Sequence, residues 1–346
     1  MCFSIEEPHQ ANGWGSGGEH PYAGAVQRAD PHADPSRQLV TRDPLRAAEC
    51  LEAGGLAVVP TETVYGLAAD AEQPEAVRRV FDVKGRPTDH PLIVHIATAE
   101  ALGDWVAEIP AAAATLAAAC WPGPLTLLLP RSKRVPDIVT GGRDTVGIRV
   151  PAHSLTQQLL KASGGGIAAP SANRYGKVSP TTVRHVLDDL GALLDPERDV
   201  VLDGGPSPIG IESTIVDCTA FPPQILRPGG IPTENIAALL DTPIAPASGP
   251  SRAAGMIASH YAPRATVHLV DRRADGIAAA DRFRAAGLAV RVIDGTGDLV
   301  RYARNLYADL RSADDDGCTD VIAVMPQAIG LGHAIRDRLQ KAAARK

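Results

Sequence analysis

The sequence has few cysteines, and no two of them stand at a metal-binding spacing. Five cysteines occur among 346 residues, without a C-x-x-C motif. An odd number of widely separated cysteines argues against a disulfide framework and against a zinc site. We therefore expect small buried thiols in a reducing compartment. The cysteines are Cys2, Cys50, Cys120, Cys218 and Cys318.

Long apolar runs are also absent. No run reaches the roughly 18–20 residues that a membrane-spanning helix needs. The N-terminal stretch MCFSIEEPHQANGWGSGGEH lacks the basic start and the apolar centre of a signal peptide. These absences predict a cytoplasmic protein that does not associate with membranes.

Basic clusters and aromatic residues are scarce. The net charge is -6, the sequence pI is about 5.9, and aromatic residues make up 4% of the chain. Nucleic-acid binding needs a clustered basic face, and RNA recognition needs aromatic side chains for stacking. We expect no stable nucleic-acid binding, whereas a small anionic ligand needs only a few placed cations.

Several signature motifs of catalysis are missing as well. The chain has no G-x-x-x-x-G-K-[ST] phosphate loop, no H-E-x-x-H metal motif and no G-x-S-x-G nucleophile elbow. GTGDLV, residues 295–300, is too short to count as a dinucleotide fingerprint. The sequence therefore predicts no protein-held metal.

Composition and pattern divide the chain into four parts. Residues 1–39 are rich in Gly, Pro, His, Asp and Ser without periodicity, which predicts a disordered tail. Residues 40–238 alternate apolar runs with amphipathic segments, which predicts a mixed α/β domain. Residues 239–264 are rich in Pro, Ala, Ser and Gly, as linkers are. Residues 265–346 predict a small parallel-sheet domain, because three strand–helix units follow one another.

Two cations stand before an apolar run. In DVKGRPTDHPLIVH, residues 82–95, Lys84 and Arg86 flank Gly85 and precede the predicted strand LIVHI. They could be two solvated cations at a helix end. Gly85 and Pro87 restrict the backbone, however, and only six of the 34 basic residues are lysines. A retained lysine is consistent with a need for a compact point charge.

Hydroxyl groups gather near other predicted strand ends. PTETVYGLAAD (60–70) follows a strand, APSAN (169–173) ends one, and GIESTIVD (210–217) precedes one. Such residues also cap helices and turns. At the ends of strands in an open α/β sheet they could equally bind a ligand. Arg149 ends another strand, where an arginine often serves as a structural ion-pair partner. Alone, these pieces predict an α/β protein with a cationic, hydroxyl-rich crevice for a small anion.

The order of the motifs resembles the L-threonylcarbamoyladenylate synthase family, which contains the YrdC-like domain. The motifs are PTETVYGL, KGRPTDHPLIVH, WPGPLT, VGIRVP, APSAN, SPT, GIESTIVD and LRPGG. The linker elements GM (255–256) and HYAP (260–263), with NLYADLR (305–311) and GLGHAIRDRLQKAA (330–343), resemble the long two-domain form. The resemblance implies a YrdC-like twisted open mixed sheet, followed by a small Rossmann-like parallel-sheet domain.

The resemblance also implies the reaction. The family makes L-threonylcarbamoyladenylate from L-threonine, bicarbonate or CO2, and ATP, releasing diphosphate, as the first step of the t6A37 modification of tRNA. A separate transferase complex consumes the product. The implied cofactor is Mg²⁺ carried with ATP. The resemblance therefore implies that the chain is a nucleotidyltransferase.

The resemblance implies three groups of site residues. The catalytic signature around the phosphates corresponds to Lys84, Arg86, Ser171 and Asn173. The ATP contacts correspond to Arg86, His90, Thr145, Ser171, Ser179, Arg227 and Tyr261. The threonine contacts correspond to Thr63, His95, Arg149, Ala169 (through its backbone) and Ser213. Tyr261 lies in the linker, so the linker is expected to fold over the site as a lid.

Two other functions compete with this one. The domain could bind a nucleotide or RNA without turnover; the acidic balance and the lack of an aromatic, basic surface disfavour RNA. It could transfer carbamoyl groups like the related domain of hydrogenase maturation proteins, but the cysteine-rich and acylphosphatase-like segments of those proteins have no counterpart here. The sequence leaves open the oligomeric state, the docking partner, the roles of the tail and the C-terminal domain, and the choice between bicarbonate and CO2.

Overall fold

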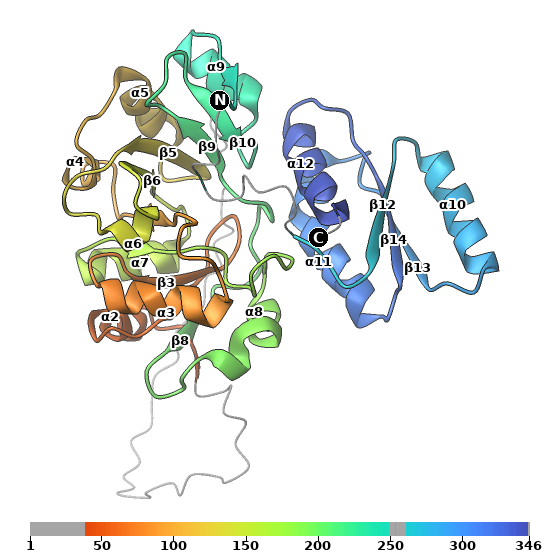
Figure 1. Ribbon diagram of the computed structural model, residues 1–346, viewed down its shortest axis with the longest axis horizontal. Helices are drawn as coiled ribbons and strands as arrows, with labels where there is room; N and C mark the ends of the chain where they lie inside the picture. The colour runs from red at the N-terminus through yellow and green to blue at the C-terminus, as the bar shows by residue number, and fades with distance from the viewer. Residues whose placement is uncertain (1–38, 249–252, 254–260, 345–346) are drawn as a thin grey trace, which may run out of the picture.

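The structure is a computed structural model, and it describes residues 39–248, 253 and 261–344. The predicted tail lies outside the described residues except for Leu39. The GM motif and His260 of the linker also lie outside them. Two units are visible in Figure 1, one built on a large sheet and the other on a small sheet.

The large unit is organised around a mixed sheet of eleven strands in the order β1-β8-β2-β3-β7-β4-β6-β5-β9-β10-β11. β4 pairs with β6 in parallel and with β7 in antiparallel orientation. The strands are β1 (Val40–Thr41), β2 (Ala57–Val59), β3 (Gly66–Asp70), β4 (Ile93–His95), β5 (Leu125–Pro130), β6 (Thr145–Arg149), β7 (Ile167–Ala168), β8 (Val200–Leu202), β9 (Thr214–Asp217), β10 (Gln224–Arg227) and β11 (Ala245–Pro246).

Short helices pack against this sheet. α2 and α3 bury apolar residues that recur at helical spacing, and both carry a proline at the start, where its missing N–H costs nothing. The helices are α2 (Pro44–Glu52), α3 (Pro74–Lys84), α4 (Leu102–Trp105), α5 (Ala111–Cys120), α6 (Asp137–Thr140), α7 (Ser154–Ser163), α8 (Val183–Leu190), the 3₁₀ turn η1 (Gly191–Leu193) and α9 (Thr233–Leu240).

The small unit has a parallel sheet in the order β12-β14-β13. In Figure 1, α10 covers its outer face, whereas α11 and α12 lie between the sheet and the large unit. Strands and helices therefore alternate along this unit, as predicted. The elements are β12 (Thr266–Val270), α10 (Arg273–Ala285), β13 (Val290–Ile293), α11 (Leu299–Asp315), β14 (Asp320–Val324) and α12 (Leu331–Ala343).

The predicted fold class, a mixed open sheet with a second parallel sheet, is confirmed. The elements that were not predicted are β1, β3, α6, η1, β8, α9 and β11. β3 consists mostly of small residues, and it exists because it pairs with β2 on one side and β7 on the other. Such pairing depends on tertiary context, which local patterns do not contain.

Side chains of α11 join the two units. Arg311 forms an ion pair with Asp189 of α8 (2.7 Å), and Arg304 donates to the carbonyl oxygen of Pro208 (2.8 Å). Val64 and Ile211 of the large unit share one apolar cluster with residues of the small unit. Among the described helices, none is long and apolar enough to cross a bilayer.

Candidate active site

A cleft lies over the middle of the large sheet, where β4 runs between β7 and β6. Ile93 and His95 of β4 both line it, because alternate residues of a strand face the same side. The cleft has a volume of about 630 Å³, open solvent included. It brings together nine of the predicted site residues, namely Thr63, Arg86, His95, Arg149, Ala169, Ser171, Ser213, Arg227 and Tyr261.

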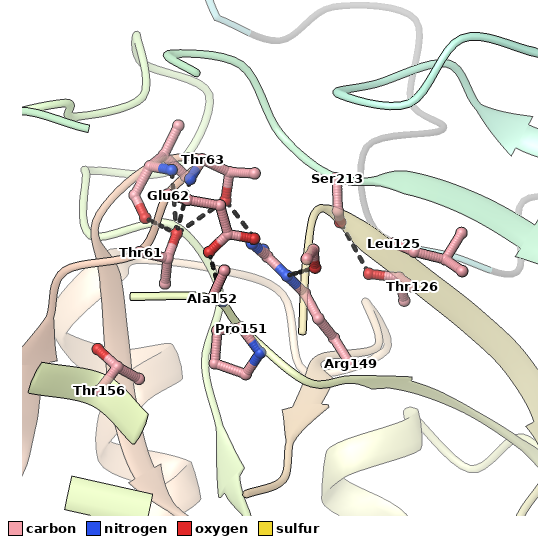
Figure 2. Close-up of polar contacts among 12 residues, drawn as sticks. Thr61, Glu62, Thr63, Leu125, Thr126, Arg149, Pro151, Ala152, Thr156 and Ser213 are labelled. Atoms are coloured by element: carbon pink, nitrogen blue, oxygen red, sulfur yellow. Dashed lines mark hydrogen bonds and ion pairs between the residues drawn. The ribbon is translucent and has the colours of Figure 1, made fainter. Parts of the chain in front are cut away.

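Arg149 is anchored in the cleft by side-chain and backbone contacts (Figure 2). It is 4% exposed, and it donates to the Thr63 hydroxyl (2.9 Å) and to the carbonyl oxygen of Gly123 (3.2 Å). Its third contact is an ion pair with Glu62, whose other oxygen accepts from the backbone N–H of Ala152 (3.0 Å). Glu62 balances the guanidinium charge, and the guanidinium keeps donors for a carboxylate ligand.

Ser213 forms the neighbouring wall. Its hydroxyl lies 2.7 Å from the hydroxyl of Thr126, the pair drawn at the right of Figure 2. Arg227 donates to the Ser213 hydroxyl (3.0 Å) and to its carbonyl oxygen (2.9 Å). Burial lowers the pKa of Arg227 from its usual value. The hydroxyl and the guanidinium are thus fixed relative to each other before any ligand binds.

His95 presents a neutral imidazole. Burial, followed by the nearby charge of Arg149, lowers its pKa to about 3. Its Nδ1 is buried and has no hydrogen-bond partner among the described residues. A buried polar atom without a partner costs free energy, so this nitrogen is a candidate contact for a polar ligand group.

Lys84 and Arg86 have different surroundings. The helix α3 ends at Lys84, and Gly85 follows in the left-handed conformation with φ of 64°. Lys84 is buried and donates to the carbonyl oxygens of Ser171 and Asn173, so it fastens the 171–173 loop and does not line the cleft. Burial, followed by Arg86, holds the pKa of the Lys84 ammonium well below its usual range.

Arg86 itself lines the cleft. Its guanidinium is held by the carbonyl oxygens of His90 (3.4 Å) and Pro91 (3.0 Å). Burial lowers its pKa to about 10, so it stays charged at neutral pH. Of the predicted pair, the structure therefore presents Arg86 to the cleft and Lys84 to the loop behind it.

Five predicted residues do not line the cleft: Lys84, His90, Thr145, Asn173 and Ser179. His90 pairs through Nδ1 with the Tyr175 hydroxyl (3.1 Å). Asn173 donates to the carbonyl oxygens of Arg174 (2.8 Å) and Lys177 (2.9 Å). Thr145 begins β6, at the strand end opposite Arg149.

Ser179 leads to a residue that the sequence interpretation left without a role. Its hydroxyl donates to Glu212 (2.7 Å), and Glu212 lines the cleft directly before Ser213. Glu212 stands inside the GIESTIVD motif, and that position is the only signal that pointed to it. The other lining residues without a predicted role are Thr61, Val64, Gly66, Leu92, Ile93 and Pro170.

No group of three or more His, Cys, Asp or Glu side chains in the described part of the chain is arranged to hold a metal ion. The cleft offers instead arginines, hydroxyls, one neutral imidazole and one carboxylate. Such a set suits substrates that carry carboxylate and phosphate groups.

Two family models match the chain. The model described as "Telomere recombination" matches residues 49–229, and the model described as "Threonylcarbamoyl-AMP synthase, C-terminal domain" matches residues 231–344. A threonylcarbamoyl-AMP synthase of Pyrococcus abyssi is 42% identical over 320 residues, which are 86% of this chain and 92% of that protein. One of Bacillus subtilis is 38% identical over 336 residues, which are 90% of this chain and 96% of that protein.

A solved structure agrees over the same length. The crystal structure of P. abyssi Sua5 complexed with L-threonine superposes with a TM-score of 0.81 at 41% identity, covering 87% of this chain and 94% of that one. With these matches, the fold and the cleft define an enzyme of the nucleotidyltransferase type. The chain belongs to the threonylcarbamoyl-AMP synthase family, in the form that carries the additional C-terminal domain. The family predicted from the motifs is thus confirmed, and the non-catalytic binding module is not favoured.

Proposed function

We propose that the cleft converts L-threonine, bicarbonate and ATP into L-threonylcarbamoyladenylate, diphosphate and water. The observation that carries the proposal is the juxtaposition of two kinds of cationic site in one cleft. Arg149 with Thr63 and Ser213 suits an amino acid, and Arg86 with Arg227 suits a polyphosphate. The solved structure of a relative with bound L-threonine supports the assignment of the amino-acid site.

The threonine end of the cleft rests on Arg149. A guanidinium fixed by Glu62 and Thr63 is preorganised to bind a carboxylate. The hydroxyl groups of Thr63 and Ser213 and the imidazole of His95 suit the polar groups of threonine, and the backbone of Ala169 closes the site. A site that hydrogen-bonds a substrate group rejects analogues lacking it more strongly than an apolar pocket does.

The phosphate end rests on Arg86 and Arg227, with the Ser171 hydroxyl beside them. Lys84 supports this end from behind, because it holds the loop that carries Ser171 and Asn173. His90, Thr145 and Ser179 do not line the cleft, and the family resemblance implies them as further contacts for the nucleotide. Mg²⁺ enters with ATP as part of the substrate and neutralises the phosphates.

The chemistry proceeds in two steps. The threonine amine attacks the carbon of bicarbonate, and loss of water gives N-carboxythreonine. Its carboxylate then attacks the α-phosphorus, the bond to the bridging oxygen breaks, and diphosphate leaves with that electron pair. The second step brings anions together, so fixed cations supply most of the catalysis.

Tyr261 closes the cleft from the linker side. It is 1% exposed, and it lies next to the part of the linker, residues 254–260, that is outside the described residues. We propose residues 239–264 as a lid over the nucleotide, between a synthase domain (40–238) and a C-terminal domain (265–346). The structure places the first residues of this range in α9 and β11, and 249–252 and 254–260 lie outside the described residues. We further propose that the reaction takes place in the cytoplasm and that the product passes to a tRNA-modifying transferase complex.

Labelled bicarbonate tests the proposal. The enzyme is incubated with ATP, Mg²⁺, L-threonine and ¹³C-bicarbonate, and the nucleotide products are analysed by mass spectrometry. We expect an adenylate that contains both threonine and the labelled carbon. Formation of AMP or ADP alone would contradict the proposal.

A further inference from the structure

Arg338 of α12 connects the small unit to the cleft without lining it. It is 0% exposed, and its Nε donates to Glu212 (2.7 Å). Its Nη1 donates to Asp337 (2.5 Å), and the guanidinium lies 5.3 Å from the ring centroid of Tyr261. Arg338 therefore contacts two residues that line the cleft, Glu212 and Tyr261.

Tyr307 of α11 contacts the same two residues. Its hydroxyl donates to the carboxylate of Glu212, at 2.8 Å from Oε2 and 3.0 Å from Oε1. Its ring stacks on the ring of Tyr261 with 5.4 Å between centroids. Two side chains from two helices of the small unit thus converge on one pair of cleft residues.

The backbone of Tyr261 gives an independent reason why it needs such support. Its φ is 61°, which is a costly conformation for a residue with a side chain. A strained residue persists only where its surroundings fix it. The Tyr307 ring and the Arg338 guanidinium of the small unit pack on the Tyr261 side chain, while the N–H of the adjoining Ala262 donates to the carbonyl oxygen of Gly176 in the large unit (3.0 Å).

We infer that Arg338 and Tyr307 are positioning residues of the cleft, which hold Glu212 and Tyr261 in place for ATP. The small unit is then a working part of the nucleotide site, and not only an appended domain. The inference rests on the proposed function for the identity of the ligand.

Of the two positioning residues, Arg338 should matter more, because its positive charge offsets the negative charge of Glu212. Glu212 faces the cleft and meets Arg338 from α12, Tyr307 from α11, Arg227 from β10, and Ser179 and Tyr261 from loops. Asp337 of α12 pairs with Arg338. Lys341, farther along α12, binds Asp337 (2.9 Å). Burial disfavours the ionised carboxylate, but Arg338 and then Arg227 outweigh it and lower the pKa of Glu212 to about 2.

Loss of Arg338 would leave a negative charge facing the phosphates of ATP. In an Arg338→Met variant, burial is opposed by Arg227 and the remaining hydrogen bonds alone, so the pKa of Glu212 rises from its wild-type value and acidification neutralises more of the carboxylate. The variant should therefore bind ATP weakly at pH 8 and recover part of the affinity at pH 6. A merely structural defect would not recover on acidification.

Calorimetry of ATP binding at pH 6 and pH 8 tests this on the full chain. Wild type at both pH values corrects for the titration of ATP itself. We expect Arg338→Met to raise the Kd for ATP about tenfold at pH 8, which is the scale of one hydrogen bond to a charged group. We expect Arg338→Lys, which keeps the positive charge, to bind ATP with a Kd close to that of wild type. The matched control is Arg336→Met, because Arg336 lies on the same helix and donates to the carbonyl oxygen of Pro326 within the small unit (2.8 Å).

The inference would be overturned if folded Arg338→Met bound ATP at pH 8 with the Kd of wild type. It would also be overturned if the variant bound ATP weakly at pH 8 and equally weakly at pH 6. If Arg338→Met does not fold, Tyr307→Phe tests the inference instead. This substitution removes only the hydroxyl that donates to Glu212 and keeps the ring that stacks on Tyr261. We expect a Kd raised about threefold to tenfold, and an unchanged Kd overturns the inference. Because binding needs no turnover, this result is independent of whether wild type makes the proposed product.

Discussion

At the scale of single residues, Arg149 carries the proposed specificity for threonine. Its charge is balanced by Glu62 and its orientation is fixed by Thr63. We expect Arg149→Met to raise the KM for threonine by about 100-fold, because a charge-assisted carboxylate contact is lost and Glu62 is left without its partner. Steady-state kinetics with varied threonine measures the effect, and calorimetry with ATP serves as the control. An unchanged KM for threonine would place the amino acid elsewhere.

Lys84 is the second residue whose role can be measured. It fastens the loop that presents Ser171 to the cleft, and its charge lies close to Arg86. We expect Lys84→Ala to lower the rate of diphosphate release by roughly 10²-fold, because the loop that presents Ser171 loses its anchor and a small misplacement of a site group costs about that much. The far-UV circular dichroism and the melting temperature of the variant show whether it is folded. A loss below about threefold would mean that Lys84 is dispensable.

At the scale of elements, the turn after α3 decides where Lys84 and Arg86 point. Gly85 has φ of 64°, where a side chain is strained, although no atom lies within 4 Å of an added Cβ. We expect Gly85→Ala to lower the free energy of unfolding by about 1 kcal/mol through backbone strain alone. Urea unfolding measures this, with Gly297→Ala as the control, because Gly297 has open space and no positive φ. Equal stability of the two variants would contradict this account of the turn.

The elements also show what the sequence could predict. The predicted strand LIVHI contains β4, and the three predicted strand–helix units of residues 265–346 are β12–α10, β13–α11 and β14–α12. β3 was missed because its small residues are strand-like only between β2 and β7. The inward direction of Lys84 was also beyond the sequence, since it depends on carbonyl groups 87 and 89 residues farther along the chain.

At the scale of the whole molecule, Glu212 links stability to pH. Its folded pKa of about 2 lies below the ordinary value of 4.5. A depressed carboxyl pKa stabilises the folded chain above pH 4.5, and that contribution disappears as the pH falls towards 2. We expect the free energy of unfolding to fall more steeply between pH 5 and pH 3 for wild type than for Glu212→Gln. Denaturant unfolding at several pH values measures both slopes, and identical slopes would contradict the prediction.

The link between the two units also marks a limit of the sequence. The motifs NLYADLR and GLGHAIRDRLQKAA resemble those of the long family form, but nothing in them shows that Tyr307 and Arg338 meet Glu212. These residues are 95 and 126 positions from Glu212, and packing of α11 and α12 against the large unit brings them together. The order of the motifs therefore identified the family. The contacts of Tyr307 and Arg338 with the cleft residues could be found only in the structure.

The central claim is that one cleft joins threonine to ATP through bicarbonate. The most direct measurement is diphosphate release from ATP, with and without L-threonine and bicarbonate, and with L-serine in place of threonine. We predict release that requires both co-substrates and is much slower with serine. Release at the same rate without threonine would contradict the account, because the amino acid would then take no part in the step that expels diphosphate.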